Sequence, residues 1–275
     1  MEKEPFRFKD SLLFIDSWNK IDRNIVVGMT TRQGGFSKAP FNSMNLGLHV
    51  YDSPEDVIQN REQLAKQLNI PLASSVYAEQ VHGANITRVT KAERGKGATE
   101  LETAIKGVDG LYTGDDSTFL FAAYADCVPL YFYAPKHHLV GIAHAGWRGT
   151  VNNIAGEMIK AWTNKENVRA DEILVSIGPA IGECCYIVDN NVIEQLDKAL
   201  DYKMLDDVYS KLKGGQYRLN LKQANFLLLI NAGVSANNIE ISTYCTCCHH
   251  NLFFSHRRDN GKTGRMLSFI GMKGE

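Results

Sequence analysis

The sequence has no run that approaches the ~18 consecutive apolar residues of a membrane-spanning helix. It also lacks an excess of either charge, because 30 Lys and Arg against 31 Asp and Glu leave a net charge of −1. This balance argues against a nucleic-acid-binding protein, which normally carries a basic excess or a basic face. The apolar stretch at residues 12–15 is too short for a secretory signal. We therefore expect a soluble cytoplasmic protein with no membrane or nucleic-acid partner.

No internal repeat, low-complexity segment or linker rich in Pro, Gly and Ser divides the chain, so we expect a single domain over residues 1–275. Short apolar runs typical of buried strands mix with helical patterns but without a strict βαβ rhythm, which predicts an α/β fold with a mixed β-sheet covered by helices. We expect strands at residues 25–29, 75–81, 86–90, 119–125, 130–133, 139–143, 173–177, 239–243 and 266–270. We expect helices at residues 53–68, 151–162, 192–200 and 221–232.

Six cysteines in a chain of this size are first considered for metal or catalytic roles rather than for disulfides. Cys127 precedes an expected strand and His144 ends the next one. If a hairpin turns between Pro135 and Lys136, these two side chains face each other with Cβ atoms ~4.5–5.5 Å apart. That spacing suits a shared metal or a catalytic Cys–His pair. A buried cysteine beside a hydrogen-bonded core histidine is the structural alternative.

A glycine-flanked Trp–Arg pair follows His144 directly. Gly146 and Gly149 permit a sharp turn, which would bring the guanidinium of Arg148 close to His144. A guanidinium recognises phosphate or carboxylate with a planar fork of N–H groups, although a surface arginine in a helix-initiating loop is equally consistent with the pattern. His82, at the end of another expected strand, is either a third metal ligand or a turn histidine.

Several segments together resemble the YfiH-like purine nucleoside phosphorylases, a family also labelled polyphenol oxidases or laccase-domain proteins. They are Gln-Val-His-Gly at residues 80–83, Ala-Asp-Cys-Val-Pro at 125–129, His-Ala-Gly-Trp-Arg-Gly at 144–149, Gly-Pro-Ala-Ile-Gly-Glu-Cys-Cys-Tyr at 178–186, Phe-Phe-Ser-His-Arg-Arg at 253–258 and Thr-Gly-Arg at 263–265. The resemblance covers nearly the whole chain from residue 30. It implies an α/β sandwich with a mixed sheet, a fold shared with proteins classed as cysteine hydrolases.

The resemblance implies that His82, Cys127 and His144 bind one metal ion. Two imidazoles and a thiolate suit zinc, and three protein ligands leave a fourth position open, as in catalytic zinc sites. Zinc lowers the pKa of a bound water to ~7. Copper also fits such a site, but conventional laccases use many histidines in His-x-His pairs. This chain has eight histidines and no His-x-His, so we expect zinc, with copper-dependent phenol oxidation as a secondary activity.

The implied activity is phosphorolysis of adenosine, inosine and S-methyl-5′-thioadenosine to the free base and ribose or methylthioribose 1-phosphate, together with deamination of adenosine to inosine. Purine nucleosides and phosphate are thus the expected partners. Gln80 is assigned to substrate binding. Asp126, next to the thiolate ligand, is expected to orient a ligand or the substrate, or else to be a buried structural aspartate.

Phosphate must be held near the sugar C1′ by cations. Our candidates are Arg148, Arg61 and Arg32, each of which is alternatively a solvated surface charge. A basic cluster at residues 256–258 with Arg265 is expected either to close the substrate site or to form a salt-bridged surface.

Two other classes of function fit the same residues. One is a cysteine hydrolase or amidase that uses Cys127 as nucleophile and His144 as base. The other is a non-catalytic, metal-dependent binding module. Metal analysis separates the first from a zinc enzyme, because a bound zinc would occupy the thiolate that a hydrolase needs.

A second metal cluster is also conceivable near the C-terminus. Cys245 and Cys248 have the C-x₂-C spacing of structural zinc sites. Cys184 and Cys185 would complete a set of four ligands. Free thiols, buried or on the surface, are the default interpretation, because the resemblance matches Cys245 alone in this stretch and Cys247, Cys248 and the adjoining histidines depart from the family pattern.

Overall fold

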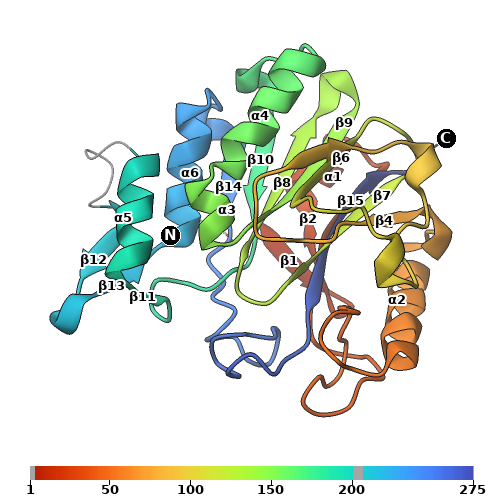
Figure 1. Cartoon of the computed structure of the whole chain (residues 1–275). Helices are drawn as coiled ribbons and strands as arrows, with labels where there is room; N and C mark the ends of the chain where they lie inside the picture. Colours follow the sequence, from red (N-terminus) through yellow and green to blue (C-terminus); the bar gives the residue numbers. More distant parts are fainter. Residues whose placement is uncertain (1–3, 201–206, 275) are drawn as a thin grey trace.

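Two six-stranded β-sheets form the centre of the molecule in the computed structural model, which describes residues 4–200 and 207–274 (Figure 1). The first sheet has the order β1 (Phe6–Lys9), β2 (Leu12–Ile15), β3 (Ile25–Thr30), β15 (Met266–Met272), β7 (Phe119–Tyr124), β4 (Ser75–Tyr77). The second has the order β14 (Ile239–Ile241), β10 (Leu174–Ile177), β8 (Val128–Ala134), β9 (Leu139–Ala145), β6 (Gly110–Thr113), β5 (Ile86–Arg88). A small third sheet consists of β11 (Ile187–Asp189), β13 (Gln216–Leu219) and β12 (Tyr209–Lys211).

Strand β8 shows how its sequence builds a layered core. Its side chains alternate between the two faces of the sheet, as a pleated strand requires. Leu130 and Phe132 pack in a cluster with helices α4 (Ile154–Lys165) and α6 (Leu221–Asn231). Tyr131 and Tyr133 point the other way, into a cluster with residues of β2, β3 and β7 from the first sheet. A near-continuous apolar strand therefore marks a sheet that is covered on both faces.

Helix α2 (Pro54–Leu68) covers the outer face of the first sheet, packing on β7 and β15, and lies on the opposite side of the molecule from α4 and α6 (Figure 1). The layers thus run helix, sheet, sheet, helices. Both large sheets are mixed, because β4–β7, β5–β6 and β10–β14 pair in parallel and the other neighbours are antiparallel. This confirms the expected α/β fold with mixed sheets covered by helices.

The helix starts follow local sequence chemistry. The Ser53 side chain accepts a hydrogen bond from the N–H of Asp56, and Pro54 opens α2, which is the expected capping pattern. The helix expected at residues 151–162 is instead two helices, α3 (Trp147–Val151) and α4. Asn153 separates them with φ of 56° and caps α4 through a bond from the N–H of Gly156. Helices α1 (Asp16–Asn19) and α5 (Asn190–Ala199) complete the set.

The hairpin of β8 and β9 has a different register from the one we expected. Pro129 pairs with His144, and Ala134 pairs with Leu139 across the turn. The predicted facing of Cys127 and His144 was therefore wrong, because the turn lies one residue later and includes a short 3-10 helix. Cys127 precedes β8, in the connection that crosses from the first sheet to the second.

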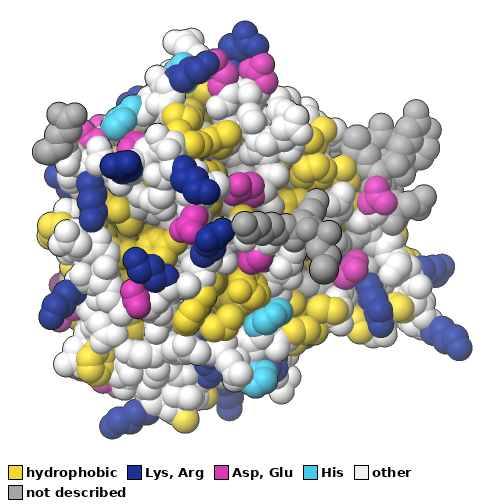
Figure 2. All heavy atoms as spheres, turned by 180° about the vertical axis from the view of Figure 1, so that it is seen from behind, with side chains coloured by type: hydrophobic (Ala, Val, Ile, Leu, Met, Phe, Trp, Pro, Cys, Tyr) yellow, Lys and Arg dark blue, Asp and Glu magenta, His cyan; other side chains and the backbone are white. Residues whose placement is uncertain are grey.

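No helix among the described residues is long and apolar enough to cross a membrane. On the face seen in Figure 2, basic and acidic side chains are interspersed among the described residues. That face carries no stripe of one charge, in keeping with the balanced composition.

Candidate metal centre

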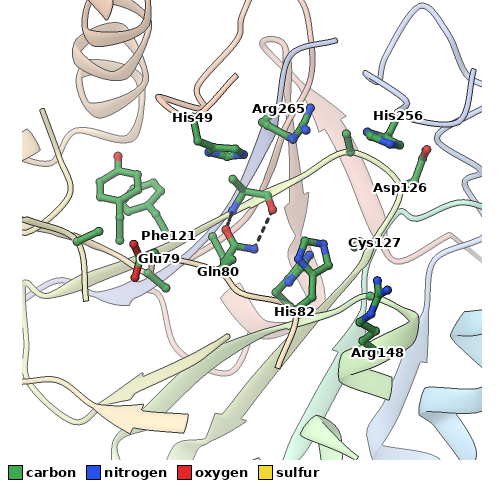
Figure 3. A pocket seen from close by; sticks show the side chains of 18 of the residues that line it. His49, Glu79, Gln80, His82, Phe121, Asp126, Cys127, Arg148, His256 and Arg265 are labelled. Atoms are coloured by element: carbon green, nitrogen blue, oxygen red, sulfur yellow. Dashed lines mark hydrogen bonds between the residues drawn. The ribbon is translucent and has the colours of Figure 1, made fainter. Parts of the chain in front are cut away.

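Three side chains from separate segments of the chain converge near the ends of strands β4, β7 and β9. His82 follows β4, Cys127 lies between β7 and β8, and His144 is near the end of β9. One ligand atom from each lies within 4.8 Å of the others, and the two imidazole rings meet edge to face with centroids 4.7 Å apart. Figure 3 shows the imidazole of His82 close to the labelled position of Cys127. Convergence on a single point is therefore present despite the shifted hairpin register.

Asp109 organises this group, although our sequence analysis did not select it. Its side chain is buried, and Oδ1 accepts a hydrogen bond of 2.9 Å from Nδ1 of His144. The same carboxylate accepts bonds from the backbone N–H groups of Val81, His82 and Gly83. One carboxylate thus fixes the ring of one histidine and the backbone of the other. The one sequence feature that could have indicated Asp109 is its position directly before a short apolar strand, β6 (Gly110–Thr113).

The charged forms of Cys127, His144 and Asp109 stabilise one another. Burial raises the pKa of Cys127, but the imidazolium of His144 and hydrogen bonds from His144 and His82 outweigh it and bring the pKa down to about 6. Burial lowers the pKa of His144, but the Cys127 thiolate and Asp109 outweigh it and raise the pKa to about 9. Asp109 itself has a lowered pKa, since its bonds with His144 and the backbone amides overcome the effect of burial. The group therefore favours a thiolate at neutral pH.

The donor set fits a metal ion. Asp109 occupies Nδ1 of His144 and leaves Nε2 free to bind, and such carboxylate–histidine pairs are usual behind metal-ligating imidazoles. Gly146 makes room for the group, because a Cβ there would lie 3.0 Å from Sγ of Cys127 and 3.2 Å from Cδ2 of His82. Two imidazole nitrogens and one thiolate suit zinc, and also copper.

A cavity of about 610 Å³ opens onto the three side chains. Toward one end lie Tyr77 and Phe121, whose rings stack with centroids 5.0 Å apart. Trp147 and Tyr186 also contribute aromatic surface to the cavity wall. The volume and aromatic lining are those of a small-molecule site.

Arg148 is the predicted residue with the most freedom to bind a ligand. It lies on α3, is exposed and lines the cavity, and no described residue accepts a hydrogen bond from its guanidinium. The guanidinium rests over the ring of Trp147 at 4.3 Å, and Figure 3 shows it beside the Cys127 end of the cavity.

Gln80 and Asp126 line the cavity but are engaged with the protein. The amide of Gln80 makes hydrogen bonds with both the N–H and the C=O of Ala123 (Figure 3). Asp126 is buried and accepts bonds from Thr246 Oγ1, Ser255 Oγ and the N–H of Arg257. Its φ of 87° is unusual for a residue other than glycine, so these bonds hold a strained backbone beside Cys127.

The other two predicted arginines are largely occupied. Arg61 lines the cavity but is buried, and its guanidinium donates to the carbonyls of Leu46, Gly97 and Ala98. Arg32 does not line the cavity. It lies over the ring of Phe254 at 4.6 Å and donates to backbone carbonyls. The structure therefore does not bring Arg32 together with the metal group.

Some residues of the basic cluster at 256–258 with Arg265 lie at the cavity, and one forms a salt bridge. His256, Arg257 and Arg265 line the cavity. Arg258 instead forms a salt bridge with Asp259, at 2.8 Å.

Comparison with known proteins identifies the family. Residues 26–273 match the family model described as multi-copper polyphenol oxidoreductase laccase. The chain is 52% identical over 250 residues to purine nucleoside phosphorylase YlmD of Geobacillus stearothermophilus, covering 91% of each chain. It is 46% identical over 266 residues to the protein of the same name from Bacillus subtilis, covering 96% of this chain and 95% of that one.

Solved structures agree with this similarity over the full fold. The crystal structure of YlmD from Geobacillus stearothermophilus gives a TM-score of 0.96 at 47% identity, covering 99% of this chain and 100% of that one. Protein NMB0706 of Neisseria meningitidis gives a TM-score of 0.78 at 29% identity, covering 91% and 95%. The chain belongs to the laccase-like family that includes YlmD and YfiH.

Proposed function

We propose that this protein is a purine nucleoside phosphorylase with a zinc ion held by His82, Cys127 and His144. The observation that carries the proposal is that these three side chains open onto an aromatic cavity. The cavity also contains the guanidinium of Arg148, from which no described residue accepts a hydrogen bond. The two relatives named purine nucleoside phosphorylase YlmD support the same class of substrates.

Zinc bound there would supply Lewis acidity at the floor of the cavity. Asp109 would hold the imidazole of His144 in the tautomer that presents Nε2, and would fix the backbone at His82. Asp126, through its three hydrogen bonds, would keep the neighbouring Cys127 in place. These two aspartates are therefore positioning residues rather than groups that touch the substrate.

Phosphorolysis joins a phosphate oxygen to C1′ of the sugar and breaks the bond from C1′ to the purine nitrogen. The purine leaves with the bonding electron pair and takes up a proton. Arg148 would hold the phosphate, because charge-assisted bonds from a guanidinium are strong and directional. Arg265 and Arg257 also line the cavity, and their charges would favour an anion there.

The purine would lie against the aromatic walls, since flat rings gain from stacked or edge-to-face contact. We propose adenosine, inosine and S-methyl-5′-thioadenosine as substrates, with deamination of adenosine as a second activity of the same site. Both activities require a purine close to the three metal ligands. Only phosphorolysis requires an anion beside Arg148.

The test is a metal analysis of protein made without added metal, combined with assays of adenosine and inosine with and without phosphate. We expect bound zinc, inosine from adenosine without phosphate, and free base with ribose 1-phosphate when phosphate is present. The Cys127→Ala variant should lose all purine turnover. Normal turnover by Cys127→Ala would refute the proposal.

A cysteine hydrolase is the second candidate, and a specific observation favours it. His144 lies between the Cys127 thiol and the buried carboxylate of Asp109, an arrangement that activates a nucleophile. Metal analysis separates the two candidates. A protein with no zinc at His82, Cys127 and His144 that is nevertheless alkylated and inactivated at Cys127 would be the hydrolase.

The family description names copper, and we propose copper-dependent phenol oxidation only as a secondary activity. Among the described residues, His82 and His144 are the histidines found in a potential metal-binding group. One His₂Cys group can hold one copper, which is fewer than a multicopper oxidase uses.

A further inference from the structure

Four cysteines form a second group, away from the three ligands of the cavity. Cys184 and Cys185 lie in the loop between β10 and β11, and Cys245 and Cys248 lie in the segment that follows β14. Their four Sγ atoms all lie within 4.8 Å of one another. Sγ of Cys248 is 3.4 Å from that of Cys185 and 3.6 Å from that of Cys184. All four are free thiols in the structure.

These distances match a metal site better than a disulfide. Four sulfurs that surround zinc tetrahedrally at ~2.3 Å lie ~3.8 Å from one another. The sulfurs of a disulfide are ~2.05 Å apart. We propose that Cys184, Cys185, Cys245 and Cys248 bind a second zinc ion, in a closed structural site. With four protein ligands the site leaves no position for a substrate or water, which distinguishes it from the cavity site.

The surroundings of the group suit a cluster of thiolates. The N–H of Gly182 donates to Sγ of Cys245 at 3.2 Å. Lys222 of α6 is buried and donates to the carbonyls of Ser242 and Tyr244, close enough to Cys245 and Cys184 for their charges to interact with it. The charge of Glu4 also acts on Lys222, more strongly than the two cysteines do. Zinc with four thiolates carries a net charge of −2, which would add to the negative charge that Glu4 places near this buried cation.

The location suggests what the second zinc does. The two cysteine-bearing segments pair through a β-bridge between Ala180 and Cys245. Thr246 donates through its hydroxyl to Asp126, and the N–H of Ile181 donates to the Asp126 carbonyl. Asp126 precedes Cys127. The proposed zinc site would therefore hold together the two cysteine-bearing segments. These segments contact the strained backbone of Asp126, which precedes Cys127.

Metal counting and X-ray absorption on purified, reduced protein test this directly. We expect two zinc ions per chain in the wild type and one in Cys248→Ser. Cys127→Ala should retain one zinc with sulfur as its only ligand type. Cys247→Ser is the matched control, since Cys247 lies in the same segment but outside the group of four, and it should retain two zinc ions.

The Cys127→Ala arm also covers the case in which Cys248→Ser does not fold, and it is independent of the proposed activity. Zinc retained by an inactive Cys127→Ala protein supports the second site whatever the first site catalyses. A Cys127→Ala protein without zinc, or with nitrogen ligands on its zinc, would overturn the proposal. A disulfide between Cys185 and Cys248 in wild-type protein purified without reductant would also overturn it.

Discussion

Oδ1 of Asp109 lies 2.9 Å from Nδ1 of His144, and the same oxygen accepts the backbone N–H of His82 at 2.9 Å. A single buried oxygen therefore orients two of the three ligands. We therefore expect the loss of the Asp109 carboxylate to weaken metal binding, although Asp109 is not itself one of the proposed metal ligands.

Replacing Asp109 with Asn keeps the size of the side chain but removes its charge. We expect metal affinity at the cavity site to fall by roughly 10- to 100-fold, the usual cost of losing such a partner. Metal competition with a chromophoric chelator measures the change. Asp116→Asn is the matched control, because Asp116 forms an exposed 2.7 Å pair with His138. Equal affinity in the two variants would contradict the role of Asp109.

The metal-free protein should show an acidic thiol at Cys127. The neighbouring imidazolium holds the pKa of Cys127 at about 6 despite burial, so the reactive thiolate persists as pH falls and is lost only near pH 6. Alkylation followed by peptide mass spectrometry should show a half-maximal rate near that pH. His144→Ala should move the midpoint up toward the ordinary value of ~8.5. A midpoint in the ordinary range before the mutation would refute this coupling.

Arg148→Ala should separate the two proposed activities. Hydrogen bonds to charged groups contribute ~1.5–3 kcal/mol each, so phosphorolysis should slow by roughly 10- to 150-fold at low phosphate. Deamination should suffer less, because it needs no anion. Arg32→Ala, which alters an arginine outside the cavity, should change neither rate. Equal losses in both activities would make Arg148 a structural or base-positioning residue, and no loss would direct attention to Arg61.

Gly146→Ala should damage the cavity site sterically. The added methyl would lie 3.0 Å from Sγ of Cys127 and 3.2 Å from Cδ2 of His82, closer than ordinary packing allows. We expect lower zinc affinity at this site while the four-cysteine site stays occupied. Gly274→Ala, whose methyl would meet its nearest atoms at 3.5 Å, should bind zinc as the wild type does. An unchanged affinity in Gly146→Ala would mean that the loop adjusts freely.

Much of the fold was predictable because its strands are buried and its main helices begin with clear signals. The run over β8 is apolar on both faces, and Ser53 with Pro54 marks the start of α2. We did not predict β1, β2 or the strands of the small third sheet. Strand β1 is mostly exposed, so its identity depends on its pairing with β2 rather than on a strong apolar pattern.

The convergence of the three proposed ligands was predictable from the sequence, but the residue that supports them was not. His82, Cys127 and His144 stood out through their motifs, whereas Asp109 and the backbone it holds come together only in three dimensions. The predicted hairpin register was wrong because the turn lies one residue later than expected, and this displacement changes every facing pair. The sequence also did not indicate that the guanidinium groups of Arg61 and Arg32 donate to backbone carbonyls, because those carbonyls belong to segments distant in the sequence.

The central claim is that zinc held by His82, Cys127 and His144 supports purine chemistry in the adjoining cavity. The most direct test is to remove metal from the protein and measure phosphate-dependent release of hypoxanthine from inosine as zinc is returned. We expect no release at first, recovery to a saturating rate in both the wild type and Cys247→Ser, and no recovery in Cys127→Ala. Full activity in the metal-free protein, or recovery in Cys127→Ala, would contradict the account.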